Sequence, residues 1–185
     1  STPHTVELTP AEASGCRNYQ GQVWYRKHFT VPSECGDKEA LLHFEAVMGK
    51  QKFYINGKRV GEDWFNPGMS QYRETLTYHA YDVTSMLGKG NNALGAIVGP
   101  GFYTGYMTFT PANYNFWGDH EALMAKMVVT YADGSTETIV TDPATWKLST
   151  DGPIEYASMF QGQRYNAQKE AAVAGWNEVG YDAAA

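Results

Sequence analysis

Apolar and polar residues alternate with a period of two along most of the chain, and this alternation restricts the fold more than any other feature. Residues 123–131 (LMAKMVVTY) place an apolar side chain on one face at every second position. Residues 40–47 (ALLHFEAV) and 23–31 (VWYRKHFTV) follow the same pattern, although Trp24 and Lys27 interrupt the latter. Such alternation is typical of strands that bury one face. We therefore expect a fold built from short amphipathic strands.

Turn signals separate these strands at short intervals. Asn56-Gly57 predicts a type I′ hairpin, because both turn positions need a positive φ, and Asp133-Gly134 predicts a second hairpin. Residues 167–176 (AQKEAAVAGW) contain good helix formers but few apolar anchors, so no long helix is expected. About eight or nine antiparallel strands result, and the predicted fold class is all-β, an antiparallel β-sandwich or jelly roll.

Length and composition limit the classes of protein and of partner. The 185 residues suit one β-sandwich domain, with residues 1–21 as a leader segment and 167–185 as an exit segment. The C-terminal sequence GWNEVGYDAAA has no closing element, so we expect a fragment of a larger multidomain protein. The net charge is −6, and Lys and Arg are not clustered along the sequence. Both features argue against a nucleic-acid partner. No apolar run reaches the roughly 18 residues of a membrane span, so no membrane insertion is expected.

The chain is rich in aromatic residues and poor in charge. Aromatic residues make up 14% of the sequence and charged residues 18%. This balance favours a periplasmic or extracellular protein that meets neutral polar ligands or packs on other domains. Residues 1–14 show no signal peptide. Cys16 and Cys35 flank the first strand pattern, which leaves open a disulfide or two unpaired thiols.

Motifs for catalysis or metal binding are weak. The sequence has no Gly-x-Ser-x-Gly, no Cys-x-x-Cys and no pair of histidines at helical spacing, so no cofactor is predicted. The sequence leaves open a structural Ca²⁺ site near Asp63 or Asp119. His28, His43 and Glu45 share outward faces, where solvated cross-strand pairs are the favoured interpretation.

Two pairs of carboxylates resemble, in their residue types, the acid pair that glycoside hydrolysis uses. These pairs are Glu62-Asp63 and Asp119/Glu121. Neighbouring residues of a strand point to opposite faces, so the first pair is poorly placed for joint chemistry. For both pairs, solvation in a loop is the favoured interpretation.

Three aromatic loops are the best candidates for ligand binding. They are residues 62–74 (EDWFNPGMSQYRE), 99–106 (GPGFYTGY) and 113–120 (NYNFWGDH). The candidate side chains for a carbohydrate site or a domain interface are Trp64, Tyr72, Arg73, Phe102, Tyr103, Tyr106 and Trp117. If the loops meet at one end of the sandwich, their rings close that end, pack on another domain, or stack on a sugar.

Several longer stretches resemble a known family. WYRKHFTVP, FYINGKRVGEDWFNPGMSQYRETLTYHAYDVTSMLGKGNNALGAIVGPGFYTGY and ALMAKMVVTYADGSTETIVTDPATWKLSTDGPI resemble the N-terminal β-sandwich domain of bacterial α-L-rhamnosidases, glycoside hydrolase family 78. The end, YNAQKEAAVAGWNEVGYD, resembles the segment that leads out of that domain. The resemblance covers residues 22–182 and implies a galactose-binding-like β-sandwich.

The same resemblance implies that the catalytic carboxylates lie elsewhere, in a separate (α/α)₆ barrel of the same polypeptide. No catalytic residue of the family maps onto this chain, which would be an accessory domain that supports or shapes the barrel. The alternatives are a free-standing carbohydrate-binding module for rhamnosides or other neutral sugars, and a self-contained glycosidase. Family members often read Gly-aromatic-Tyr-Arg-Gly where this chain has Gly101-Phe102-Tyr103-Thr104-Gly105, so a short hydroxyl replaces a guanidinium.

Overall fold

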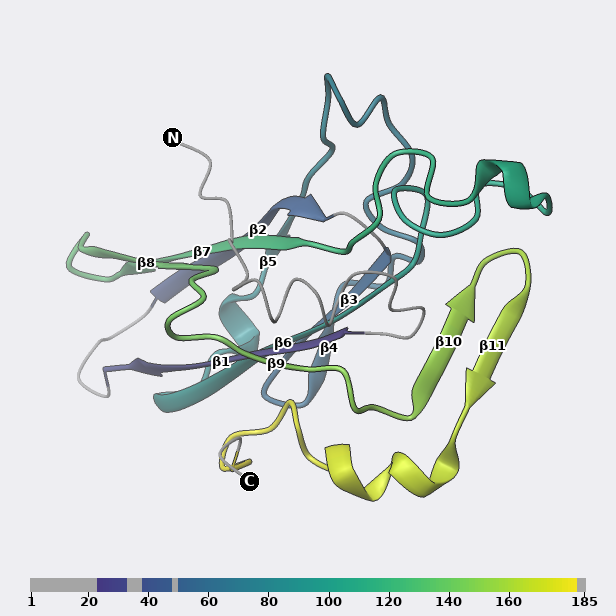
Figure 1. Cartoon of the computed structure of the whole chain (residues 1–185). Coiled ribbons are helices and arrows are strands. Elements are labelled where there is room, and N and C mark those ends of the chain that lie inside the picture. Colours follow the sequence, from purple (N-terminus) through teal and green to yellow (C-terminus); the bar gives the residue numbers. More distant parts are fainter. Residues whose placement is uncertain (1–22, 33–37, 48–49, 183–185) are drawn as a thin grey trace.

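Two antiparallel sheets stack face to face in the computed structural model, which describes residues 23–32, 38–47 and 50–182 (Figure 1). The five-stranded sheet has the order β4 (Lys58–Val60), β3 (Lys50–Ile55), β6 (Gly90–Gly99), β1 (Val23–Val31), β9 (Lys147–Ser149). The four-stranded sheet has the order β5 (His79–Asp82), β2 (Lys38–Val47), β7 (Leu123–Tyr131), β8 (Thr136–Val140). The predicted antiparallel β-sandwich is confirmed, whereas the jelly-roll topology stays a prediction.

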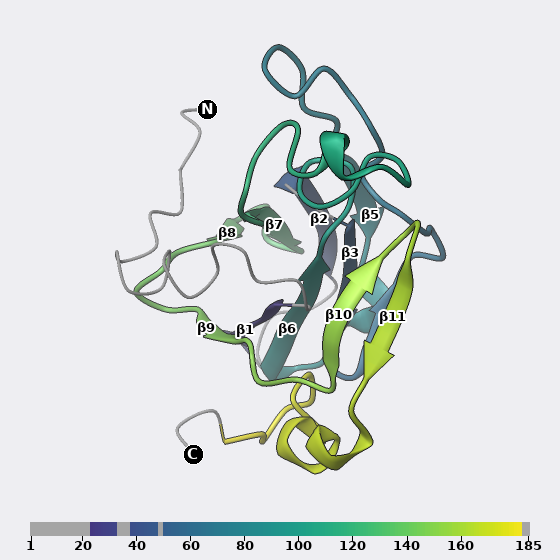
Figure 2. The same cartoon turned by 45° about the vertical axis from the view of Figure 1, so that its right-hand side comes forward.

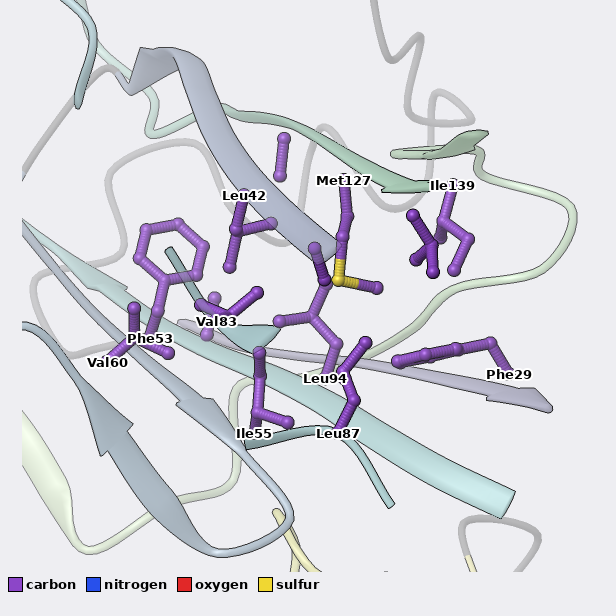
Figure 3. Packing of buried hydrophobic residues seen from close by; sticks show 14 of the residues in the cluster. Phe29, Leu42, Phe53, Ile55, Val60, Val83, Leu87, Leu94, Met127 and Ile139 are labelled. Atoms are coloured by element: carbon purple, nitrogen blue, oxygen red, sulfur yellow. The ribbon is translucent and has the colours of Figure 1, made fainter. Parts of the chain in front are cut away.

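The core lies between the two sheets and follows the alternation in the sequence. Figure 3 shows Leu42 and Met127 from one sheet pointing toward Ile55 and Leu94 from the other. All four side chains are buried. Along β7 every second residue is buried, as expected from the sequence. Burial of a large aliphatic side chain contributes about 1.5–3 kcal/mol, so this layer is the main source of stability.

Both predicted hairpin turns are present. Asn56 and Gly57 join β3 to β4 with φ values of 50° and 80°, as a type I′ turn requires. Gly134, with a φ of 83°, lies between the paired strands β7 and β8. Local turn chemistry therefore sets the register of both hairpins.

The C-terminal segment covers the outer face of the five-stranded sheet, below β1 and β6 in Figure 1. Arg26 lies on that face, as the alternation predicts, but only 6% of it is exposed. Its guanidinium donates to the carbonyl oxygens of Trp176 (2.5 Å) and Glu178 (2.9 Å). The Trp176 ring packs directly on Gly95. A Cβ at that position would lie only 2.6 Å from the ring, so the contact requires glycine. The segment predicted as an exit thus forms part of the packed structure.

A third, two-stranded sheet was not predicted from the sequence. β10 (Ile154–Ser158) and β11 (Gly162–Tyr165) form a hairpin that stands beside the sandwich (Figure 2). All four residues of β11 are exposed, so the segment has no alternation to reveal it. With this hairpin the described residues contain eleven strands rather than eight or nine.

In the part of the chain that the structure describes, helical structure is limited to short 3₁₀ turns. They are Thr84–Met86, Pro111–Asn113, Ala167–Lys169 and Ala171–Val173. Among the described residues, none of the helices has the length and apolar content that a membrane span requires.

Candidate functional site

Two long loops meet at one end of the sandwich. One loop runs from residue 61 to 78, between β4 and β5, and the other from 100 to 122, between β6 and β7. In Figures 1 and 2 both loops lie at the same end, and the tip of the β10–β11 hairpin approaches the second one. A T-shaped contact between Phe109 and Phe160, with ring centroids 5.2 Å apart, joins that loop to the hairpin.

Rings from all three predicted aromatic loops pack together at this end. Tyr72 makes edge contacts with Tyr103 and Trp117, at centroid distances of 5.2 and 5.7 Å. Trp117 also contacts Phe116 at 5.1 Å. We call Tyr72, Tyr103, Phe116 and Trp117 the aromatic cluster. Edge-to-face geometry adds roughly 0.5–1.5 kcal/mol per pair beyond burial, so the cluster fastens the loops to each other.

The aromatic cluster is packed tightly. A Cβ on Gly118 would lie 2.2 Å from the Tyr103 ring, so the close approach requires glycine. Burial raises the pKa values of the Tyr72 and Tyr103 hydroxyls. The Trp117 indole nitrogen is buried without a hydrogen-bond partner. Tyr72, Tyr103 and Trp117 therefore close the end of the sandwich by packing on one another, whereas Phe116 remains exposed.

Further contacts within the 100–122 loop stabilise its own conformation. Tyr106 lies against Tyr114 with ring centroids 4.7 Å apart. The amide of Gly105 donates to Asn115 Oδ1 at 2.7 Å, and the amide of Asn115 donates to the Gly105 carbonyl at 2.7 Å. Tyr106, a candidate from the sequence, therefore has a packing role inside its own loop.

Trp64 lies apart from the aromatic cluster and is 62% exposed. Lys52 Nζ and the Arg59 guanidinium carbon each lie 4.5 Å from its ring centroid. Beside it is an open hollow with a free interior of about 160 Å³, which we call the Trp64 cleft. The cleft is lined by Gln51, Lys52, Asp63, Trp64, Phe65, Ile97 and Gln163.

Glu121 corrects the prediction that both carboxylate pairs are solvated. Only 2% of this residue is exposed, and Thr104 Oγ1 donates to its Oε1 at 3.1 Å. Burial raises the pKa of Glu121 to about 7, although hydrogen bonds from its own backbone and from Thr104 act in the opposite direction. The prediction failed because Glu121 lies two residues before Leu123, the first buried residue of β7. Its side chain therefore points to the same buried face as Leu123. The other three acids, Glu62, Asp63 and Asp119, are exposed as predicted.

A narrow pocket surrounds Glu121. Asp119, Tyr156 and Ser158 also line it, but its free interior is about 20 Å³. Such a volume holds a water molecule and not a sugar ring. The two acids therefore do not frame a substrate here.

The remaining candidates are scattered. Arg73 is exposed and Phe102 is half-buried, and neither belongs to the aromatic cluster or the Trp64 cleft. Within the described ranges, no three His, Cys, Asp or Glu residues lie close enough together to hold a metal ion. His28 contacts Arg26, while Cys16, Cys35 and the side chains of His43 and Glu45 lie outside the described part.

Sequence reasoning missed part of the Trp64 cleft. Lys52 and Ile97 occupy outward positions of β3 and β6, and Gln163 belongs to the unpredicted β11. The alternation places Lys52 opposite the core residues Phe53 and Ile55, which was a usable signal. No sequence signal placed Gln163 beside Trp64.

The fold thus defines an antiparallel β-sandwich domain with its candidate site at one loop-bearing end. The family model described as "Alpha-L-rhamnosidase N-terminal domain" matches residues 38–185. The chain belongs to this family, the N-terminal domain of glycoside hydrolase family 78 rhamnosidases.

Individual relatives agree with the family. An alpha-L-rhamnosidase of Streptomyces avermitilis is 39% identical over 158 residues, which are 85% of this chain and 14% of the relative. The crystal structure of a Streptomyces avermitilis alpha-L-rhamnosidase complexed with L-rhamnose matches 88% of this chain and 15% of that chain, with a TM-score of 0.79 and 36% identity. An alpha-L-rhamnosidase from Aspergillus terreus matches 96% of this chain and 21% of that chain, with a TM-score of 0.82 and 31% identity. The chain thus spans a small part of the length of these relatives.

Proposed function

We propose that this domain is a non-catalytic accessory module of an α-L-rhamnosidase, which packs through its loop-bearing end on the catalytic (α/α)₆ barrel of the same polypeptide. The rhamnosidase relatives are several times longer than this chain, so most of their length lies in other domains. In the family that the chain belongs to, catalysis is expected in the barrel. The domain would then stabilise the barrel or shape its substrate entrance.

The observation that carries this proposal is the distribution of exposed apolar side chains. Phe109 is 75% exposed and Phe116 is 56% exposed, and both belong to the 100–122 loop. The 61–78 loop adds the exposed side chains Met69, Leu76 and Tyr78. A concentration of large apolar groups on one side of a domain is typical of a surface that another protein part covers. Barrel side chains are the occupant that the family membership favours.

The geometry around Glu121 supports the non-catalytic part of the proposal. Glycoside hydrolysis needs two carboxyl groups about 5–10 Å apart with a sugar between them. Asp119 and Glu121 share a pocket that holds a water molecule, so a glycosidic bond has no room there.

A hydrolysis assay tests the non-catalytic part. The isolated chain, incubated with p-nitrophenyl α-L-rhamnopyranoside, is expected to release p-nitrophenol no faster than buffer alone. A rate above buffer that disappears in Glu121→Gln would overturn the proposal and favour a self-contained glycosidase. The matched control is Glu137→Gln, because Glu137 lies on β8, away from the loops that form the Glu121 pocket.

Recognition of carbohydrate is a second candidate function, favoured by the Trp64 cleft. The cleft combines exposed rings with charged and amide groups, as sugar-binding sites do. Its free interior of about 160 Å³ is much larger than that around Glu121. Titration of the chain with a monosaccharide glycoside tests this candidate, and binding that is lost in Phe65→Ser would support it.

A further inference from the structure

The Trp64 cleft has a floor made by the outer face of the five-stranded sheet. Lys52 and Ile97 are directly paired across β3 and β6, so both side chains project from the same outer face. Asp63, Trp64 and Phe65 form one wall, while Gln163 of β11 lies on the other side. The floor and walls come from separate parts of the chain, so the fold itself creates the hollow.

Positive charge exceeds negative charge around the cleft, because Lys52 in the lining and Arg59 beside Trp64 lie near one carboxylate, that of Asp63. Lys52 Nζ and the Arg59 guanidinium both lie close to the Trp64 ring. Burial and the nearby charge of Arg59 lower the pKa of Lys52. Within the described ranges, neither cation forms an ion pair with a carboxylate. This local excess contrasts with a net charge of −6 for the whole chain.

Asp63 contributes one negative charge to the lining of the cleft, and its carboxylate is held by a hydrogen bond from Tyr81. The Tyr81 hydroxyl donates to Asp63 Oδ2 at 2.6 Å, and this hydrogen bond is the main cause of a lowered Asp63 pKa. The Asn66 amide in turn donates to the Tyr81 oxygen at 2.9 Å. The Asp63 backbone carbonyl accepts a hydrogen bond from Arg59, which holds the guanidinium over the Trp64 ring.

Phe65 supplies an exposed apolar surface at the cleft. Its φ of 61° lies in the left-handed region, which non-glycine residues rarely adopt. Such backbone strain persists where the surrounding structure requires one orientation of a side chain. Phe65 and Ile97 thus offer apolar contacts beside the Lys52 ammonium.

We propose that the Trp64 cleft binds an anionic sugar residue, a hexuronate unit of a glycan, with its carboxylate on Lys52 and its ring against Phe65 and Ile97. An ammonium and a carboxylate form a charge-assisted hydrogen bond, and the C–H face of a pyranose suits aromatic and aliphatic surfaces. Arg59 adds attraction for the same carboxylate, and Trp64 holds both cations in place. This proposal rests on carbohydrate recognition, the second candidate function, and it specifies the class of sugar.

Calorimetric titration of the 185-residue chain tests the proposal with three probes: methyl β-D-glucuronide, methyl β-D-glucoside and sodium acetate. At low ionic strength the glucuronide should bind about tenfold more tightly than the glucoside, the difference of a single charge-assisted contact. Lys52→Gln should abolish that preference, because it removes the charge and keeps much of the aliphatic stem. Lys58→Gln is the matched control, since Lys58 is an exposed lysine on the neighbouring strand β4 and does not line the cleft.

Each other outcome has a definite meaning. Equal affinity for the glucuronide and the glucoside overturns the anionic preference and leaves carbohydrate recognition standing. Absence of binding by both glycosides overturns this proposal together with the second candidate function. If acetate binds as tightly as the glucuronide, the cleft is a site for anions alone, and this outcome also overturns the proposal of a hexuronate site. A thermal unfolding curve of Lys52→Gln that matches the unchanged chain establishes that a lost preference is not a folding defect.

Discussion

The aromatic cluster and the Trp64 cleft use the same residue types for opposite purposes. In the cluster, Tyr72, Tyr103 and Trp117 contact each other edge to face and are half-buried. In the cleft, Trp64 and Phe65 are exposed, and the neighbours of the indole are cations. Rings that satisfy one another hold loops together, whereas rings that face solvent beside charged groups are available to a ligand. The neighbours of an aromatic side chain, and not its presence in a loop, therefore decide its role.

The largest expected effect concerns the burial of Glu121 on the cluster side. Its pKa in the folded chain is about 7, against an ordinary value of 4.5, so the folded state retains a proton that the unfolded state loses. The contribution of this group is therefore most favourable below pH 4.5 and is lost as the pH rises toward 7, by up to about 3 kcal/mol. Glu121→Gln should remove this loss. Urea unfolding at pH 5 and pH 8 measures it, and an unchanged difference between the two pH values in Glu121→Gln would contradict the assignment.

The next effect separates the two aromatic regions directly. Trp117→Ala should lower the free energy of unfolding by about 2–3 kcal/mol, because it removes a half-buried ring that contacts two others. Trp64→Ala should change it by less than about 1 kcal/mol, since this ring is exposed and held by cation–π contacts at the surface. Chemical denaturation of both variants gives the values. Equal losses would break the distinction between a packing region and a binding region.

A smaller effect tests how tightly the aromatic cluster is packed. Gly118→Ala places a methyl group 2.2 Å from the Tyr103 ring, so the ring must move, at a cost of about 1–3 kcal/mol. Gly88→Ala is the matched control, because a Cβ at that position would lie 3.9 Å from its nearest neighbour, Asn92 Oδ1. Thermal unfolding should show a lower Tm for the first variant alone. Similar Tm values for both variants would mean that the cluster is loose.

The smallest effect concerns the cleft itself. Arg59→Lys keeps a positive charge but loses the planar group over Trp64 and the hydrogen bond to the Asp63 carbonyl. We expect a loss of stability below about 0.5 kcal/mol, in line with an exposed substitution. The fluorescence of a tryptophan responds to its surroundings, so the emission spectrum should change more than the stability. A large fall in stability with no change in emission would show that Arg59 has a structural role elsewhere.

Local patterns in the sequence predicted most of the sandwich. The alternation along 123–131 identified the buried face of β7, and Asn56-Gly57 identified the turn between β3 and β4, because both features depend on neighbouring residues alone. The β10–β11 hairpin was missed because β11 is exposed at every position. The burial of Arg26 was missed for a different reason, since it depends on Trp176 and Glu178, about 150 residues further along the chain.

The candidate site was predicted in part. The sequence indicated three aromatic loops, and the structure joins them through Tyr72, Tyr103 and Trp117, a meeting that the sequence had left open. It did not separate Trp64 from that group, because the separation depends on Lys52 and Arg59 on two neighbouring strands. Glu121 was expected in solvent, and only the packing of the following strand shows that it is buried.

Hydrogen exchange of the loop-bearing end tests most directly whether another domain covers it. Amide exchange of residues 69–78 and 109–116 would be measured in the isolated chain and in the full polypeptide to which it belongs. We predict markedly slower exchange of both segments in the full polypeptide, with residues 132–136 at the β7–β8 turn unchanged as an internal control. Identical exchange of both segments in the two samples would contradict docking of the barrel on this surface.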